Sequence, residues 1–191
     1  PMHAAEPMFT AVAFLYARFD LPESGQWSEL SSGQVVHFQP PDLDHGNTVL
    51  NLSKRLAEFA SVSEGYPCFD LGLLLQTDPD TVWFPAVSYF VEGPRFAETD
   101  RAFTPTVPAA VIELASTADR REPMPDRVER YMDWGVQLAW IIDPAEQTVQ
   151  TLHSTRPADV ECFGPGDRLV GRGPLAGLSF EVLELFTEPE W

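Results

Sequence analysis

The chain has 191 residues, of which 44% are hydrophobic and 12% are aromatic. This composition suits one compact domain with a substantial core. Twelve basic and 29 acidic residues give a net charge of −17. The electric field of the protein therefore repels nucleic acid at long range, unless a local basic groove or a bound metal reverses that field. A DNA-binding protein that relies on a broad basic surface is disfavoured.

The cysteines and the first residues indicate the cellular setting. Cys68 and Cys162 lie far apart and form no Cys-x-x-Cys pair, so neither a zinc site nor a disulfide framework is predicted, and reduced thiols fit a cytoplasmic protein. Residues 1–4 resemble the remnant of an expression tag, and no basic stretch followed by a long apolar one suggests export. Apolar runs such as residues 136–142 are too short for a bilayer and predict buried strands.

The first predicted elements are a short strand and a helix. The apolar and β-branched content of residues 33–38 predicts the strand, with Glu29 just before it. Residues 44–47 offer capping side chains to a helix over about 48–60, whose apolar residues recur at helical spacing. Lys54, the single lysine of the chain, points away from that apolar face.

Three strands are predicted next, at residues 69–76, 81–91 and 109–115. The turn-like sequence at 77–80 joins the first two strands and predicts a hairpin. Residues 92–108 carry charges of both signs together with glycine and several prolines. We interpret this segment as a surface loop that could move over a site.

The last predicted elements begin with a helix over about 125–134, with proline in its first turn and Gly135 at its end. Strands at 138–142 and 148–153 form a hairpin around the turn 143–146, and a strand pair near 159–170 closes the order. This order predicts an α/β fold, with a mixed β-sheet flanked by α-helices on both sides.

Four segments of the chain resemble motifs that occur together in one known family. They are residues 27–36 with Pro40-Pro41 and His45-Gly46, then Val111-Ile112-Glu113-Leu114-Ala115-Ser116-Thr117-Ala118-Asp119, then residues 127–144, and last Leu175-Ala176-Gly177-Leu178 with the terminal Leu185-Phe186. They resemble the Uma-two family, a branch of the PD-(D/E)xK superfamily that is assigned to the restriction endonucleases. In that family they correspond to the opening, to the Glu-Val-x-Ser-Pro-Ser-Asp segment, to the helix and strand that follow it, and to the C-terminal part.

The resemblance runs from about Arg18 to Phe186, and the block from Glu113 to Pro144 is its most specific part. It implies a restriction-endonuclease-like fold. We therefore expect residues 1–17 to be an N-terminal segment and residues 18–191 to be a single restriction-endonuclease-like domain.

The resemblance also implies a chemistry, in which acidic side chains hold Mg²⁺ or Mn²⁺ against the scissile phosphate and a cation stabilises the transition state. Three acids and one lysine normally supply these groups. By resemblance, Glu29 and Glu113 are the metal ligands, and Glu113 and Arg127 are the catalytic residues. Arg127 stands where the family has a lysine, while the superfamily's Glu-x-Lys becomes Glu113-Leu114-Ala115.

Ala86 stands at the aspartate position of the Pro-Asp motif, and its methyl group cannot bind a metal. Asp80 cannot replace that aspartate, because it lies about 20 Å away along an extended strand. Arginine keeps the charge of lysine but cannot serve as a titratable base. The active site is therefore expected to be degenerate.

Two functions follow from the resemblance. The first is a metal-dependent DNA endonuclease with impaired catalysis, and the alternative is a non-catalytic binding or dimerisation module that keeps the nuclease fold. The expected partners are DNA and a second copy of the chain in a homodimer, in the cytoplasm and without a membrane.

Each candidate residue also has a structural interpretation. A buried carboxylate in an apolar strand is costly without a partner, which favours a site role for Glu113. Glu29 could be a strand-edge acid, and Arg127 could be a surface ion-pair residue. His45 fits the neighbour of a helix cap better than a metal ligand. The sequence contains no G-x-S-x-G, Walker, dinucleotide-binding or H-E-x-x-H motif.

Overall fold

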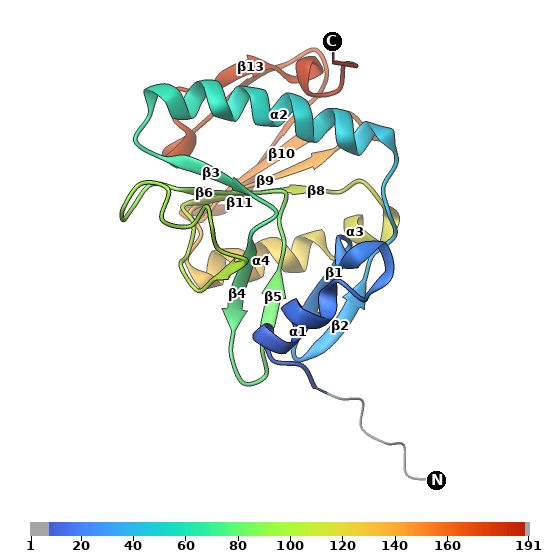
Figure 1. The fold of residues 1–191 in the computed structure, drawn as a ribbon. Coiled ribbons are helices and arrows are strands. Elements are labelled where there is room, and N and C mark those ends of the chain that lie inside the picture. The colour runs from blue at the N-terminus through green and yellow to red at the C-terminus, as the bar shows by residue number, and fades with distance from the viewer. Residues whose placement is uncertain (1–7, 190–191) are drawn as a thin grey trace.

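The structure is a computed structural model that describes residues 8–189. Helices cover both faces of a central sheet, and a second sheet lies beside it (Figure 1). The helices are α1 (Ala11–Arg18), α2 (Leu43–Val62), α3 (Ala118–Arg121) and α4 (Met124–Trp134), with 3-10 turns η1 (Pro22–Gly25), η2 (Gly173–Leu175) and η3 (Val182–Leu185).

The central sheet has six strands in the order β11-β10-β9-β8-β6-β3. It is mixed, because β8 and β9 run parallel while its other neighbours run antiparallel. Its strands are β3 (Tyr66–Phe69), β6 (Val87–Phe90), β8 (Ala110–Leu114), β9 (Leu138–Asp143), β10 (Thr148–His153) and β11 (Arg156–Phe163).

The second sheet has five strands in the order β2-β1-β5-β4-β7, and β12 pairs with β13 in a separate ribbon. The strands of this sheet and ribbon are β1 (Ser28–Ser31), β2 (Gln34–His37), β4 (Gly72–Gln76), β5 (Thr81–Trp83), β7 (Phe103–Thr104), β12 (Arg168–Val170) and β13 (Ser179–Glu181). The α/β fold with mixed sheets flanked by helices, predicted from the sequence, is confirmed.

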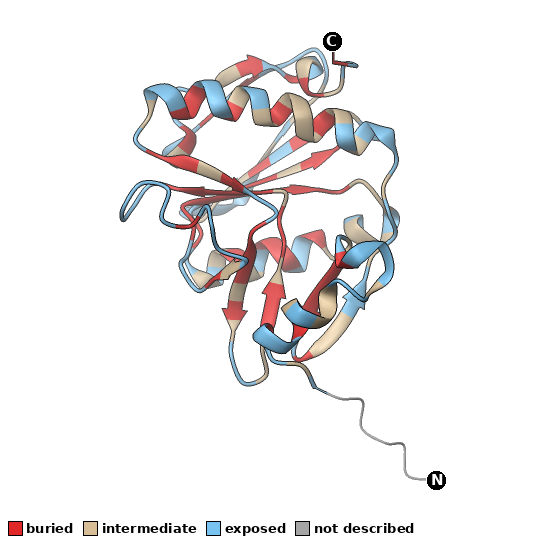
Figure 2. Cartoon of the chain, in the orientation of Figure 1, coloured by how far each residue is buried: buried red, intermediate tan, exposed pale blue. Residues whose placement is uncertain are grey.

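Strand β8 shows how the core places the site. Every residue of β8 is buried, as Figure 2 shows for the centre of the molecule. Successive side chains of a strand point to opposite faces, so Ala110, Ile112 and Leu114 join the core beneath α2 while Val111 joins the core beneath α4. The same alternation turns Glu113 toward α4, which makes a charged side chain part of that buried interface.

Two long strands expected from the sequence are each divided between the sheets. The expected strand 69–76 separates into β3 and β4 at Asp70, whose φ of 49° bends the chain. The expected strand 81–91 separates into β5 and β6 around Pro85, which has no N–H to donate to a ladder. The expected hairpin is confirmed in the five-stranded sheet, where β4 pairs antiparallel with β5. Strand β3, which pairs antiparallel with β6, lies outside the expected range except for Phe69.

The predicted strand pair near residues 159–170 is wrong. Strand β11 pairs with β10, and β12 pairs with β13. Only residues 164–167 connect β11 to β12, yet each strand finds its partner elsewhere. Strand β1 was missed, because Glu29 interrupts the apolar pattern of this short segment.

The segment expected as a surface loop, residues 92–108, is mostly irregular and contains the short strand β7. Arg95 anchors it to the end of α2 by donating hydrogen bonds to the carbonyls of Ala60 and Ser63. Residues 11–17 belong to the range expected as an N-terminal segment, and they form most of α1, whose Phe14 is fully buried. The boundary at residue 18 stays a prediction. Among the described residues, no helix combines the length and the apolar character needed to cross a bilayer.

Candidate functional site

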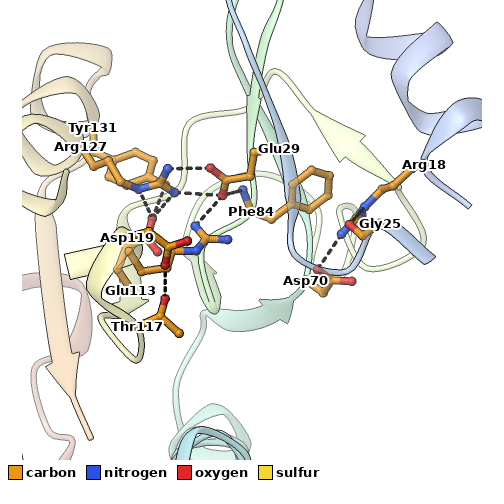
Figure 3. Close-up of polar contacts among 11 residues, drawn as sticks. Arg18, Gly25, Glu29, Asp70, Phe84, Glu113, Thr117, Asp119, Arg127 and Tyr131 are labelled. Atoms are coloured by element: carbon orange, nitrogen blue, oxygen red, sulfur yellow. Dashed lines mark hydrogen bonds and ion pairs between the residues drawn. The ribbon is translucent and has the colours of Figure 1, made fainter. Parts of the chain in front are cut away.

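Arg127 joins the two acids that the sequence singled out. Its Nη1 and Nη2 donate to the Glu29 carboxylate at 2.6 and 3.1 Å, and its Nε and Nη2 donate to Glu113 Oε1 at 3.0 and 2.6 Å. Figure 3 shows the guanidinium between the two carboxylates. The relative exposure of Glu29, Glu113 and Arg127 is 1%, 2% and 3%, so this is a fully buried ion-pair network.

Three elements bring these residues together. Glu29 lies on β1 of the five-stranded sheet, Glu113 on β8 of the six-stranded sheet and Arg127 on α4. The buried residues of α4 are spaced so that one face of the helix contacts the sheets, and they are Met124, Arg127, Val128 and Tyr131. The network therefore connects both sheets through one helix.

Further hydrogen bonds hold the carboxylates. Glu29 Oε1 accepts from the backbone N–H of Phe84 and from Arg120 Nη1, both at 2.9 Å. The Tyr131 hydroxyl donates to Glu113 Oε1 at 2.7 Å. The Arg127 guanidinium also lies over the ring of Trp83, 4.4 Å from its centroid. Several donors thus fix the orientation of both carboxylates.

The electrostatics of the network favour the charged forms. Burial by itself would raise the pKa of Glu29, but Arg127 and Arg120 outweigh it and lower this pKa to about 2. Burial would lower the pKa of Arg127, whereas Glu113 and Glu29 raise it well above its ordinary value. Burial and the Glu113 charge raise the pKa of the Tyr131 hydroxyl, which stays protonated and can donate.

The low pKa of Glu29 gives a testable acid response. Because the folded pKa of about 2 lies below the ordinary value of 4.5, this ion pair stabilises the fold above about pH 4.5 and loses that contribution as the pH falls toward 2. A carbon-detected NMR titration of the glutamate carboxyl groups is expected to place the Glu29 midpoint near pH 2. A midpoint at 4.5 or above would contradict the network.

Ala86 and Glu113 line one cleft, with a volume of about 190 Å³. Ala86 immediately precedes β6. Val87 pairs with Ile112 in the antiparallel ladder between β6 and β8, so Ala86 is the next residue along, beside Glu113. Ala86 also packs partly against the core beneath α2. Glu29 and Arg127 line a different hollow on the other side of the network. The expected meeting of Glu29, Glu113 and Arg127 is therefore found, but only Glu113 opens toward Ala86.

The donor set does not fit a divalent metal ion. Two carboxylates face two guanidinium groups, those of Arg120 and Arg127, so the network carries no excess negative charge. Ala86 offers no oxygen atom in place of the expected aspartate. Across residues 8–189, no three His, Cys, Asp or Glu side chains gather in an arrangement that could hold a metal ion.

The other acids and the lysine lie elsewhere. Lys54 is exposed on α2, as its helical position predicted. Asp80 accepts a hydrogen bond from the backbone N–H of Ala11, at the start of α1. His45 lies in the first turn of α2, which begins at Leu43 rather than near residue 48. The His45 Nδ1 is 2.7 Å from Ser116 Oγ, and the ring lies in the cleft.

The sequence interpretation missed Arg120 and Ser116. Arg120 pairs with Glu29, and its guanidinium stacks on Phe38 at 3.8 Å from the ring centroid. Both residues follow the carboxyl end of β8, where the chain enters α3. Residues at the carboxyl ends of neighbouring strands meet at one edge of a sheet. The position of Ser116 and Arg120 directly after the strand of Glu113 could therefore have predicted that they belong to the site.

Comparison with known proteins agrees with this architecture. The sequence matches the family model described as "Putative restriction endonuclease" (Uma2) over residues 16–183, and no curated protein matches it. One similar solved structure is that of "a putative nuclease belonging to DUF820" from Anabaena variabilis ATCC 29413. It is 21% identical, covers 93% of this chain and 97% of its own, and has a TM-score of 0.73. At this identity the likeness shows the fold alone, whereas the family match spans most of the sequence. The chain therefore belongs to the Uma2 (Uma-two) family of restriction-endonuclease-like proteins.

Proposed function

We propose that this family member has lost metal-dependent phosphodiester hydrolysis and keeps the nuclease fold as a non-catalytic binding module. The observation that supports this proposal most is the position of Arg127. It donates four hydrogen bonds to the two carboxylates that would otherwise be the metal ligands.

The energetic argument rests on competition between Arg127 and a metal ion. Two carboxylates with water and substrate oxygens can be enough to hold Mg²⁺. Here, however, the metal would have to displace a guanidinium that is 3% exposed. A buried charge left without its partner costs about 3–5 kcal/mol. The ion pair therefore disfavours the metal in addition to the missing aspartate at Ala86.

The alternative function is an impaired endonuclease, and retention of Glu29 and Glu113 supports it. Proteins of the restriction-endonuclease-like type generally depend on a metal ion, and DNA is the partner that the family suggests. The two functions differ in one measurable property, which is cleavage that requires a divalent metal. The homodimer and the cytoplasmic location stay predictions from the sequence.

A plasmid assay tests the proposal. Supercoiled plasmid is incubated with the full chain in Mg²⁺ or in Mn²⁺, and the nicked and linear forms are measured on a gel. We expect no nicking above a protein-free control in either metal. Cleavage that chelation abolishes, and that a Glu113→Ala variant lacks, would establish the impaired endonuclease instead.

A further inference from the structure

The cleft beside Glu113 is small and borders the buried ion pairs through Glu113 and Arg120. Its volume of about 190 Å³ is below the roughly 300 Å³ at which most ligand pockets begin. Its walls come from the segment before β1, the first turns of α2, the residues before β6 and the end of β8. This size admits a single ring system rather than a nucleic acid duplex.

Glu113 presents an unpaired acceptor to this cleft. Its Oε1 accepts from Arg127 and Tyr131, whereas its Oε2 accepts no hydrogen bond from any residue in the range 8–189. Glu113 lines the cleft, and its Oε2 is not among the side-chain atoms in that range that are both fully buried and without a partner. We therefore take Oε2 to be the oxygen that faces the cleft. An ionised carboxylate oxygen only accepts hydrogen bonds. A ligand that binds Glu113 in this cleft therefore needs an N–H or O–H donor.

The charges around the cleft favour a neutral ligand. Arg127 and Arg120 balance Glu113 and Glu29, and Asp70 at the cleft lies 3.5 Å from Arg18. A cation therefore meets no excess of negative charge. A polyanion meets the repulsion of a chain with a net charge of −17.

The cleft walls suit a flat ring. Trp27 and His45 meet edge to face, with centroids 5.4 Å apart, and Phe84 and Pro85 add apolar surface. Burial, followed by the charge of Arg120, lowers the pKa of His45, which favours the neutral ring. When the Ser116 hydroxyl donates to Nδ1, the His45 Nε2 carries the proton and can donate to a ligand.

We propose that this cleft binds a single nucleobase, presented as a nucleoside, whose amino group donates to Glu113 Oε2 while its ring packs against the Trp27 and Phe84 walls. A nucleobase combines a neutral planar ring with N–H donors and acceptors on its edge, and nucleobases stack on aromatic side chains. The proposal rests on the proposed function, because a metal on Glu113 would occupy the same oxygen atom.

Calorimetry with the full chain tests this proposal with adenosine, cytidine, guanosine and purine riboside, the last of which lacks a base N–H donor. We expect saturable binding of at least one amino nucleoside. Purine riboside is expected to bind about ten- to a hundred-fold more weakly than the best of them, since a hydrogen bond to a charged group is lost. Equal binding of purine riboside, or no binding of any nucleoside, overturns the proposal.

The 5′-monophosphate of the best nucleoside separates recognition of the base from recognition of phosphate. We expect it to bind no more tightly than the nucleoside, and clearly tighter binding would overturn the proposal. Nucleosides that fail to bind while plasmid stays intact would remove only this inference. Metal-dependent cleavage of plasmid would remove the proposed function.

A variant locates the binding site. Ala86→Leu fills the cleft without removing any group of the ion pairs and is expected to abolish nucleoside binding. Ala158→Leu, on the exposed strand β11, is the matched control and keeps it. Thermal unfolding of both variants shows whether they fold. Binding that survives in folded Ala86→Leu contradicts the assignment to this cleft, and the purine riboside comparison on the unaltered chain tests the proposal independently of either variant.

Discussion

Replacing Arg127 by methionine is expected to lower the free energy of unfolding by about 3–5 kcal/mol, because two buried carboxylates would lose their shared partner. Methionine approximates the length of the arginine side chain but offers no donor to Glu29 or Glu113. The loss would appear as a shift of the urea midpoint measured by circular dichroism.

Arg168→Met is the matched control for this variant. Arg168 also contacts a carboxylate, that of Glu181 at 2.6 Å, but the two side chains are 56% and 51% exposed. An exposed pair contributes about 0–1 kcal/mol, so the control should barely move the midpoint. Equal shifts for the two variants would show that the buried network does not stabilise the fold.

A triple variant distinguishes charge from packing. Glu29→Gln and Glu113→Gln, added to Arg127→Met, neutralise the two carboxylates that lose Arg127, while Arg120, whose side chain is 12% exposed, loses its partner Glu29. We expect the triple variant to recover part of the stability that Arg127→Met loses, since neutral buried groups cost less than an isolated charge. A triple variant less stable than the single one would contradict this account, because the charged carboxylates would then stabilise the fold through their remaining donors even without Arg127.

The helices and local hairpins could be predicted from the sequence because their signals are local. Helix α4 shows this, since its apolar positions have helical spacing and Gly135 ends it with a φ of 116°. The hairpin β9–β10 follows from the turn at residues 143–146 in the same way. Such elements depend on residues close together in the chain.

Strand β1 had a local signal that was not used. Ser32 and Gly33 connect β1 to β2 with φ values of 48° and 78°. Two positive φ angles in a two-residue connection are typical of a tight hairpin turn, for which glycine is favoured. A Ser-Gly pair before the strand at residues 34–37 therefore indicated a partner strand, and that strand carries Glu29.

The candidate site was predictable in its membership but not in its contacts. The family motifs identified Glu29, Glu113 and Arg127, and the cost of burying Glu113 indicated a partner. That a single guanidinium contacts both carboxylates depends on how α4 lies between the two sheets. The division of one predicted strand into β5 and β6 was equally hidden, because the two halves find their partners in different sheets.

Calorimetric titration with Mn²⁺ tests most directly whether Arg127 and Ala86 together prevent metal binding. The variant Ala86→Asp with Arg127→Lys restores the carboxylate and the lysine that the family resemblance implies, beside Glu113. We expect this double variant to bind Mn²⁺ at one saturable site, because the new carboxylate lies beside Glu113 on the cleft and the guanidinium that holds Glu29 and Glu113 is gone.

The unaltered chain is expected to show no saturable binding of Mn²⁺ in the same titration. Ala158→Asp with Arg127→Lys is the matched control, since it adds the same carboxylate on exposed β11, and it should also fail to bind. Saturable binding by the double variant alone is the result that this account predicts. Binding of Mn²⁺ by the unaltered chain as tight as that of the double variant would contradict it.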